Sequence, residues 1–292
     1  MRHPFFFVTP VLRCGDHALA LDRPRVMGVV NVTADSFSDG GRHLDPAAAI
    51  AHGLRLAADG ADLVDVGGES TRPGAVPVAL EEELARVLPV VRALAREGVA
   101  VSVDTRKPEV MRQAIDAGCA MVNDVGGFRA EGAIAAVERA RVAVCAMHMQ
   151  GTPATMQKDP RYADVVAEVS EFLRERAAAL ESAGVVRDRI ALDPGFGFGK
   201  TLAHNVALFR ALPRLAALGY PVLAGVSRKR MIGDLTGRET GERLAGSVAA
   251  ALLAVQNGAH IVRVHDVKET VDAIKVWLAL GTSPSPSRTG PG

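Results

Sequence analysis

One order of segments recurs along this chain of 292 residues: a short apolar run, a polar or glycine-rich loop, and then a helical pattern. The runs are continuous and rich in β-branched residues, which is typical of strands buried on both faces of a parallel sheet. There are eight: Val26–Val30, Leu63–Val66, Val99–Val103, Ala120–Val122, Val142–Met147, Ile190–Leu192, Val222–Val226 and Ile261–Val264. Eight β–α units favour a (β/α)8 barrel, and an open doubly wound sheet is the alternative.

The segments between the runs carry the signals of helix ends. Asp45-Pro46 predicts an N-cap followed by the first helical residue, and Gly60 marks where that helix stops. Asp266 and Glu269 have the spacing of a capping box at the start of the last helix. Runs and helices together predict an α/β fold, a single TIM barrel.

Both ends of the chain fall outside this repeating order. We expect residues 1–25 to form a short N-terminal hairpin extension that covers the bottom of the barrel, and the barrel itself to occupy 26–282. The tail 283–292 is rich in Ser, Pro and Gly, which is typical of disordered ends. One domain with two short extensions is therefore expected.

Composition narrows the classes of function. Hydrophobic residues make up 48% of the chain and aromatics 4%, so Ala, Val and Leu must fill the core. A net charge of +1 argues against nucleic acid or a membrane surface as partner. Cys14, Cys119 and Cys145 match no metal spacing and fit reduced thiols of a cytoplasmic protein. Phe5–Val8 is too short for a signal peptide, and no run reaches the roughly 18 apolar residues of a membrane span.

The stretch 193–201, D-P-G-F-G-F-G-K-T, raises the question of a phosphate-binding loop. The nucleotide-hydrolase loop G-x-x-x-x-G-K-[ST] would need its first glycine where this chain has Pro194, which has no N–H for a phosphate. A dinucleotide fingerprint fails as well, because Gly195, Gly197 and Gly199 are spaced by two. A nucleotide hydrolase is therefore excluded.

Polar residues follow every one of the eight runs, where barrel enzymes carry their chemistry. Any single one could be a helix cap or a loop anchor, and Asp65 and Asp124 keep that interpretation. Donors suited to an anionic leaving group form one part of the set: Asn31, Arg72, Arg263 and His265. Donors and acceptors suited to the amidine-like edge of a planar heterocycle form the other: Asp104, Asn123, Asp193 and Lys229.

The residue types also limit the metal chemistry. The sequence offers no Ser-His-Asp arrangement and no set of three or four zinc ligands. A Mg²⁺ ion held by a diphosphate and one or two protein oxygens fits better. Two Gly/Ser/Thr-rich loops, Asn31–Gly41 and Gly67–Gly74, are expected to be mobile, and Phe37 and Arg72 are costly residues for passive connections.

Seven segments, in order, resemble the bacterial dihydropteroate synthases, a pterin-binding TIM-barrel family: M-G-V-V-N-V-T-A-D-S-F-S-D-G-G, D-V-G-G-E-S-T-R-P-G, S-V-D-T-R-K-P, V-N-D-V-G-G-F, D-P-G-F-G-F-G-K, G-V-S-R-K-R and R-V-H-D-V. The resemblance implies condensation of 4-aminobenzoate with (7,8-dihydropterin-6-yl)methyl diphosphate, giving 7,8-dihydropteroate and diphosphate in folate biosynthesis. It also implies Mg²⁺ as cofactor, a homodimer, and sulfonamides as competitors of aminobenzoate.

The resemblance implies roles for the matching positions. Met147 would pack on the pterin ring, in a pocket lined by Asp104, Asn123, Asp193 and Lys229. Arg263 would stack on the other face of the ring, and the diphosphate would meet Asn31, Arg263 and His265. Asn31 would also be the protein's contact to Mg²⁺.

A second group of positions belongs to the other substrate and to the chemistry. Thr71 and Arg72 would lie on the loop that closes over the reacting groups, and Gly225 joins the substrate-binding positions. The aminobenzoate would be bordered by Phe37, Pro73, Phe198 and Lys229. The expected catalytic residues are Asp104, Asp193, Lys229 and Arg72.

The implied chemistry is alkyl transfer from carbon to nitrogen. Because aminobenzoate is a weak nucleophile and no strong base stands out, we expect diphosphate to leave first, with Asp104 and Asp193 stabilising a cationic pterin methylene. Two positions depart from the family: Ala34, where Pro is usual, and Arg230, where Ser is frequent. Arg230 either pairs with the aminobenzoate carboxylate or, as we expect, points to solvent. The alternatives are a pterin-binding methyltransferase and a catalytically silent pterin-binding paralogue.

Overall fold

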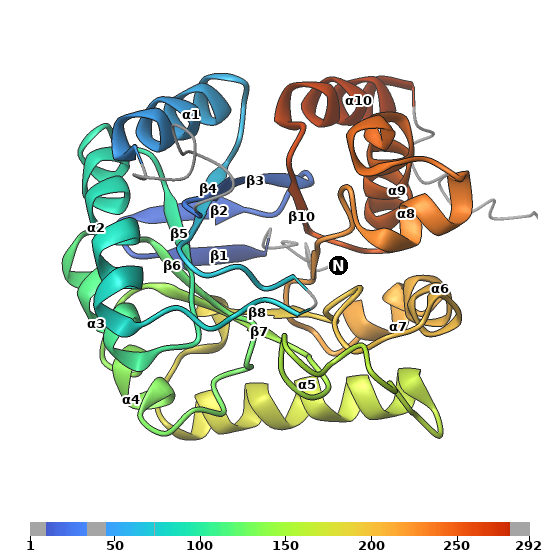
Figure 1. The fold of residues 1–292 in the computed structure, drawn as a ribbon, viewed down its shortest axis with the longest axis horizontal. Helices are drawn as coiled ribbons and strands as arrows, with labels where there is room; N and C mark the ends of the chain where they lie inside the picture. The colour runs from blue at the N-terminus through green and yellow to red at the C-terminus, as the bar shows by residue number, and fades with distance from the viewer. Residues whose placement is uncertain (1–9, 34–44, 73, 281–292) are drawn as a thin grey trace, which may run out of the picture.

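The computed structural model describes residues 10–33, 45–72 and 74–280. Its centre is a parallel sheet in the order β8-β7-β6-β5-β4-β3-β10-β9. The strands are β3 (Arg25–Asn31), β4 (Leu63–Gly67), β5 (Val101–Asp104), β6 (Met121–Asp124), β7 (Ala143–Met147), β8 (Ile190–Asp193), β9 (Leu223–Ala224) and β10 (Ile261–Val264). A parallel bridge between Leu192 and Val222 joins the two ends of the sheet, which brings it close to a closed barrel (Figure 1).

Helices surround the sheet on its outer side (Figure 1). They are α1 (Pro46–Ala58), α2 (Leu80–Arg96), α3 (Pro108–Asp116), α4 (Ala133–Val137), α5 (Val165–Ser182), α6 (Leu202–Arg210), α7 (Leu212–Ala216), α8 (Arg230–Thr236), α9 (Leu244–Gln256) and α10 (Val267–Leu280). The main hydrophobic core of the protein is the layer between the barrel and the helices, and small and branched side chains fill it. The (β/α)8 prediction is confirmed, and the doubly wound alternative is wrong.

The first helix shows how local sequence sets an element's ends. The Asp45 carboxylate accepts a hydrogen bond from the Ala47 N–H at 2.8 Å, so it satisfies one of the unpaired donors at the start of α1. Pro46, which has no N–H to lose, is the first helical residue. Gly60 follows the helix with φ +102°, where other residues are strained. All three signals act as predicted.

The N-terminal hairpin is present and closes one end of the barrel. β1 (Val11–Cys14) and β2 (His17–Ala20) pair antiparallel. Leu12, Cys14 and Leu19 are buried in a second core with the starts of the strands, including Met27 and Met121. Side chains from the hairpin therefore seal the N-terminal end of the strands, and chemistry is left to the opposite end.

The structure adjusts several boundaries. Four strands, β5, β6, β7 and β9, begin one or two residues inside their apolar runs, and β9 has two residues where a run of five was predicted. The Asp266 carboxylate, expected to cap α10, accepts two bonds from Arg228, so it joins two loops instead. Ala34 and the tail 283–292 lie outside the described residues. Among the described helices, none is both long enough and apolar enough to span a bilayer.

Candidate active site

The register of the parallel strands aligns polar side chains at one level of the barrel. Gly67 lies beside Asp104, and Asp104 beside Asn123. Between β7 and β8, Met147 lies beside Asp193. These are the last residues of their strands or next to last, so they face the C-terminal opening together.

Arg263, the third residue of β10, is the centre of a buried polar cluster. Its Nε donates to Asp65 Oδ2 at 2.6 Å, and its Nη2 donates to Asp104 Oδ2 at 3.0 Å. Asn123 Nδ2 donates to the same Asp65 oxygen at 3.3 Å. The guanidinium thus bonds two carboxylates directly, and Asp65 links it to the Asn123 amide, so side chains of β4, β5, β6 and β10 are joined.

Asp65 is the member of this cluster that the sequence did not assign to substrate. Its side chain is fully buried, and it holds both Arg263 and Asn123. Three acceptor atoms of the cluster are buried without a partner among the described residues: Asp65 Oδ1, Asp104 Oδ1 and Asn123 Oδ1. Because buried acceptors are costly when unpaired, the site suits a ligand that presents N–H groups.

The cluster's electrostatics follow from crowding of carboxylates. Burial raises the pKa of Asp104; Arg263 opposes that shift, and Asp65 adds to it. For Arg263, burial acts to lower the pKa, but Asp65 and Asp104 outweigh it and the net shift is upward. The guanidinium therefore stays charged, while burial destabilises the ionised form of Asp104.

The glycine-rich stretch after β8 is a tight turn shaped by close approach. Gly195, Gly197 and Gly199 all have φ between +62° and +81°. A Cβ on Gly195 would lie 1.9 Å from the His148 carbonyl oxygen, and one on Gly199 would lie 2.7 Å from the Gln150 carbonyl oxygen. Glycine at every second position therefore lets this loop lie close to the backbone of the loop after β7, and it does not indicate phosphate binding.

Lys200 braces that loop from inside. Its Nζ contacts the carbonyl oxygens of Gly195 at 2.9 Å and Phe198 at 3.0 Å, and His148 Nδ1 at 2.9 Å. A longer contact, at 3.4 Å, reaches the His148 carbonyl oxygen, so every donor of the ammonium group has a partner. Burial lowers the pKa of Lys200 to about 7 and that of His148 to about 3. Lys200 is 3% exposed, so its role is structural.

Lys229 and Phe198 meet at the edge of the opening. Lys229 Nζ donates to the Phe196 carbonyl oxygen at 2.5 Å and lies 4.6 Å from the centre of the Phe198 ring. Burial lowers the pKa of Lys229 to about 8, with Asp193 opposing. Burial likewise raises the pKa of Asp193, with Lys229 opposing. A cation, a carboxylate and an aromatic face are therefore adjacent.

Met147 and Gly225 complete the walls of this region. Met147 is buried in a small apolar cluster with Val125 and Met149, against which Phe198 packs. A Cβ on Gly225 would lie 3.7 Å from Lys229 Nζ and 3.7 Å from Arg263 Cβ, so this glycine separates the two cations. Gly225 therefore borders the polar cluster through Arg263, and Met147 lies beside Asp193 in the register of β7 and β8.

His265 is oriented by a serine. Ser227 Oγ accepts from the His265 backbone N–H at 3.2 Å and lies 3.1 Å from its Nδ1. A hydroxyl that accepts the backbone bond can donate to Nδ1, which would leave Nε2–H as the outward donor. Burial, with Arg263 nearby, lowers the pKa of His265 to about 4. Arg228, with φ +56°, bonds Asp266 and so joins the loops on either side.

Four other positions discussed from the sequence lie among the described residues, outside the polar cluster itself. Asn31 is the half-buried last residue of β3, paired in register with Gly67. Thr71 is half-buried, and Arg72 is exposed, with its N–H 3.4 Å from the Ser70 hydroxyl. Arg230 has a side chain 90% exposed and 3.5 Å from Asp234, as expected. Phe37 and Pro73 lie outside the described residues.

The described residues offer few ligands for a metal ion. In 10–33, 45–72 and 74–280, no group of three His, Cys, Asp or Glu side chains could hold an ion by itself. Asn31 adds one neutral oxygen at the rim of the barrel. That fits an oxygen-loving cation that takes most of its ligands from a substrate and water, as Mg²⁺ does.

Known proteins resemble this chain over most of its length. A family model described as "pterin binding enzyme" matches residues 27–265. The dihydropteroate synthase of Neisseria meningitidis serogroup C is 53% identical over 276 residues, which cover 93% of this chain and 98% of that protein. The Xanthomonas albilineans enzyme solved with 4-aminobenzoic acid aligns with a TM-score of 0.89 and 58% identity, covering 95% of this chain and 100% of that one. The same enzyme solved with 7,8-dihydropteroate aligns with a TM-score of 0.86 and 56% identity, covering 94% of this chain and 100% of that one.

Proposed function

This chain belongs to the family of pterin-binding enzymes, and from that premise we propose that it is a transferase that catalyses the dihydropteroate synthase reaction. It condenses (7,8-dihydropterin-6-yl)methyl diphosphate with 4-aminobenzoate, giving 7,8-dihydropteroate and diphosphate. The observation that carries the proposal is the buried set of acceptors on Asp65, Asp104 and Asn123, at the same barrel end as Lys229 and Asp193. Such oxygens accept bonds from several N–H groups and the Lys229 ammonium donates to one carbonyl, which matches the edge of a pterin heterocycle.

The pterin occupies the deepest part of the site. Asp104, Asn123 and Asp193 accept from its N–H groups, and Lys229 donates to its carbonyl. Met147 packs on the ring from the β7 side, and Arg263 covers the other face. Since Asp65 and Asp104 fix Nε and Nη2 of Arg263, the guanidinium plane is set before the substrate arrives.

The aminobenzoate lies nearer the solvent. Phe198 supplies an aromatic wall, and the Lys229 ammonium over its ring supports a site that holds a flat anion. Phe37 and Pro73 are proposed as its other borders. A sulfonamide competes for this position because it has the same flat arylamine and an acidic group opposite.

The diphosphate leaves toward the rim. His265 presents an Nε2–H donor, Asn31 an amide, and Arg72 and Arg263 guanidinium groups. When bound, Mg²⁺ would neutralise part of the charge that develops on the leaving group. Asn31 is the protein residue that would hold it, with the remaining ligands from diphosphate and water.

The chemistry begins with the leaving group. The carbon–oxygen bond of the methylene breaks first, and diphosphate takes the electron pair. Asp104 and Asp193, whose ionised forms are disfavoured by burial, stabilise the positive charge spread over the pterin. The arylamine then forms the carbon–nitrogen bond. Its proton leaves afterward, when the anilinium is acidic, so the step requires no strong protein base.

Diphosphate release is the measurement that tests this function. The protein is incubated with the dihydropterin diphosphate and Mg²⁺, with and without 4-aminobenzoate. Release that requires or is strongly stimulated by aminobenzoate, with dihydropteroate in equal amount, establishes the synthase. Slow release without aminobenzoate supports departure before attack. Pterin binding with no release under either condition contradicts the proposal and favours the silent paralogue or the methyltransferase.

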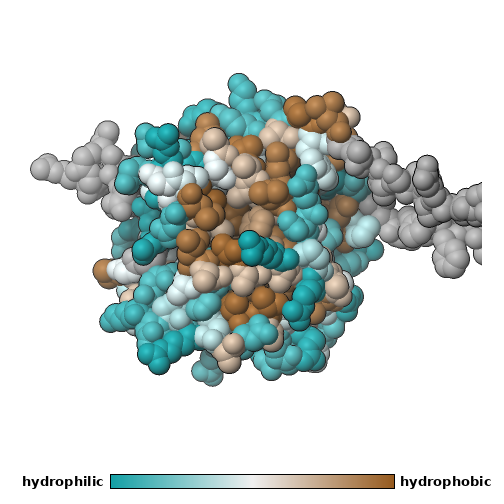
Figure 2. All heavy atoms as spheres, turned by 90° about the vertical axis from the view of Figure 1, so that its right-hand side faces the viewer, coloured by the Kyte–Doolittle hydropathy of each residue, from teal (hydrophilic) through white to brown (hydrophobic). Residues whose placement is uncertain are grey.

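A homodimer through the outer helices is part of the proposal. In the described part of the chain, six of the ten exposed large hydrophobic residues lie on α8, α9 and α10: Leu235, Leu244, Leu253, Val276, Leu278 and Leu280. Figure 2 shows apolar side chains gathered across the middle of the face that carries these helices. Apolar surface of this kind is typical of interfaces between copies of a chain.

Sedimentation of wild type and two variants tests the dimer. Leu253→Glu places a charge on the proposed interface and is expected to give monomers. Val186→Glu makes the same change at a similarly exposed apolar residue away from these helices and should leave the dimer intact. A wild-type monomer, or equal behaviour of both variants, contradicts this interface.

The cytoplasm is the proposed location. Cys14, Cys119 and Cys145 are free and buried. Burial raises the pKa of Cys14 and Cys119 to about 12, so they stay as inert thiols. Free cysteines of this kind are typical of proteins kept in a reducing compartment.

A further inference from the structure

The connection from β4 to α2 carries Thr71 and Arg72, and its two ends are tied to each other. Near one end, the Glu69 side chain is buried to 7% exposure. Its Oε2 accepts a hydrogen bond from the backbone N–H of Val78 at 3.0 Å, nine residues later. Thr71 and Arg72 therefore lie between two points that one carboxylate joins.

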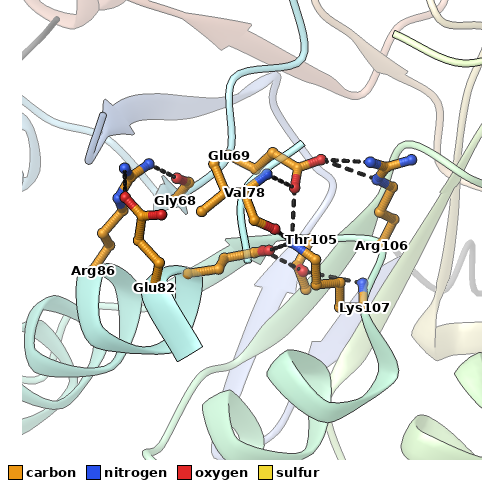
Figure 3. Close-up of polar contacts among 9 residues, drawn as sticks. Gly68, Glu69, Val78, Glu82, Arg86, Thr105, Arg106 and Lys107 are labelled. Carbon is orange, nitrogen blue, oxygen red and sulfur yellow. Dashed lines mark hydrogen bonds and ion pairs between the residues drawn. The ribbon is translucent and has the colours of Figure 1, made fainter. Parts of the chain in front are cut away.

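Lys107, just before α3, fastens the same two points. Its Nζ donates to Glu69 Oε2 at 2.7 Å and to the Val78 carbonyl oxygen at 2.7 Å. A third contact goes to Glu83, which is 1% exposed on α2. Arg106 takes the other Glu69 oxygen, with Nη2 at 2.8 Å. Figure 3 shows these side chains converging from three segments.

The cluster continues on both sides. Arg86 on α2 donates to the Gly68 carbonyl oxygen at 2.8 Å, one residue before Glu69. Thr105 donates to Glu83 Oε1 at 2.6 Å, and Thr105 directly follows Asp104 of the polar cluster. The ends of the segment that carries Arg72 are thus fixed relative to the strand that carries Asp104 (Figure 3).

A purely structural role is the competing explanation. Buried ion pairs contribute little net stability, because desolvation offsets the attraction. Here the atoms that Glu69 and Lys107 hold include the N–H and the C=O of Val78, at the far end of one segment. Burial acts to raise the pKa of Glu69, but Lys107, the Val78 N–H and Arg106 outweigh it, so the net shift is downward. The carboxylate is charged whenever the enzyme works.

The geometry points to Glu69 as a positioning residue: with Lys107 it holds both ends of the segment so that Thr71 and Arg72 reach the reacting groups. This inference rests on the proposed function, in which Arg72 meets the diphosphate. Glu69 is three residues from Arg72, so a shift at this anchor is carried to the guanidinium. Misplacing a charge-stabilising group by about 1 Å can cost up to about 100-fold in rate.

Two single variants and their combination test the inference. Glu69→Gln removes the charge and keeps the shape, and the pair between Lys107 and Glu83 remains, so folding is preserved. Arg72→Met removes the group that Glu69 is inferred to position. Glu109→Gln on α3 is the matched control, because Glu109 pairs only with neighbours on its own helix among the described residues. The readouts are kcat, KM for aminobenzoate, the Kd of a dihydropterin analogue and Tm.

Glu69→Gln is expected to lower kcat about tenfold or more while the Kd of the dihydropterin analogue and Tm stay near wild type. Glu109→Gln should match wild type. In the Arg72→Met background, Glu69→Gln should change kcat less than about twofold, because residues that act through one another are not additive.

Three outcomes overturn the inference: full activity of Glu69→Gln, a loss explained by a fall in Tm, or a loss that multiplies with that of Arg72→Met. Failure of the proposed function is separate, since wild type would then release no diphosphate. If wild type is active and Arg72→Met is also fully active, a loss in Glu69→Gln contradicts its action through Arg72.

Discussion

Two buried charge clusters meet at the end of β5, through Asp104 and the residue after it, Thr105, and they differ in which of their polar atoms stay unpaired. The first joins Arg263, Asp65, Asp104 and Asn123, and three of its acceptor atoms have no partner in the described part of the chain. The second, which includes Thr105, joins Glu69, Lys107 and Glu83, and both oxygens of each carboxylate accept a bond. Carboxylates with unpaired buried oxygens mark a place for a ligand, and carboxylates whose oxygens all accept a bond mark a support.

The pKa shifts of the two clusters differ in the same way. Burial raises the pKa of Asp104, and that shift prevails over Arg263. At Glu69 burial acts in the same direction, yet the bonded cations prevail and the pKa falls. A carboxylate poised near its titration is suited to chemistry, whereas one held firmly ionised is suited to anchoring.

The largest expected effect breaks the supporting cluster. Lys107→Met leaves Glu83, 1% exposed, and Glu69 without their shared cation, so we expect a loss of about 3–5 kcal/mol in the free energy of unfolding. Urea denaturation measures it. Lys275→Met, which breaks a pair whose lysine is 71% exposed, is the control and should change little. Equal stability of both variants would mean that the cluster does not support the fold.

Next in size is a change in the ligand cluster. Asp104→Asn keeps the shape and removes the charge that stabilises the pterin cation, so kcat should fall about 100- to 1000-fold. Steady-state kinetics with varied aminobenzoate measure kcat and KM separately. Comparable changes in both parameters would contradict the assigned role. Urea denaturation should show little loss of stability, since removing one of two carboxylates also relieves their repulsion.

The smallest expected effect is on ligand binding, when Lys229 loses its proton as the pH rises. Lys229, with its pKa lowered to about 8, should lose its proton in the free enzyme above that pH. Its bond to the pterin carbonyl is then lost, so binding of a dihydropterin analogue should weaken by up to about tenfold per pH unit above 8. Calorimetry from pH 6 to 10 (about four units) measures it. Affinity that is flat through this range would show that Lys229 does not donate to the pterin.

The strands and much of the site were predictable because each rests on local pattern. Continuous β-branched runs give the strands, and a polar residue at a strand's end is placed by the barrel alone. Asp65 and Glu69 were not assigned because their partners are distant in sequence. Arg263 is 198 residues from Asp65, and Lys107 is 38 residues from Glu69. Without those partners, each is one more acidic residue near a strand's end.

The glycine-rich stretch shows the same limit from another side. Its sequence excluded a nucleotide loop, but the reason for glycine at alternate positions needed the His148 and Gln150 carbonyl oxygens, which come from a different strand's loop. Roles at Phe37 and Pro73 stay predictions, since these residues lie outside the described part of the chain.

That loop also bears on how drug resistance can arise in this enzyme. A Cβ at Gly195 would lie 1.9 Å from backbone, and one at Gly199 would lie 2.7 Å from it, so neither clash can be relieved by turning a side chain. Mutations there would be removed by selection before they could discriminate a sulfonamide from aminobenzoate. Under the proposed function, escape is directed toward positions whose side chains border the drug and whose backbone is not so confined, and Phe198 is the described residue proposed for such a position.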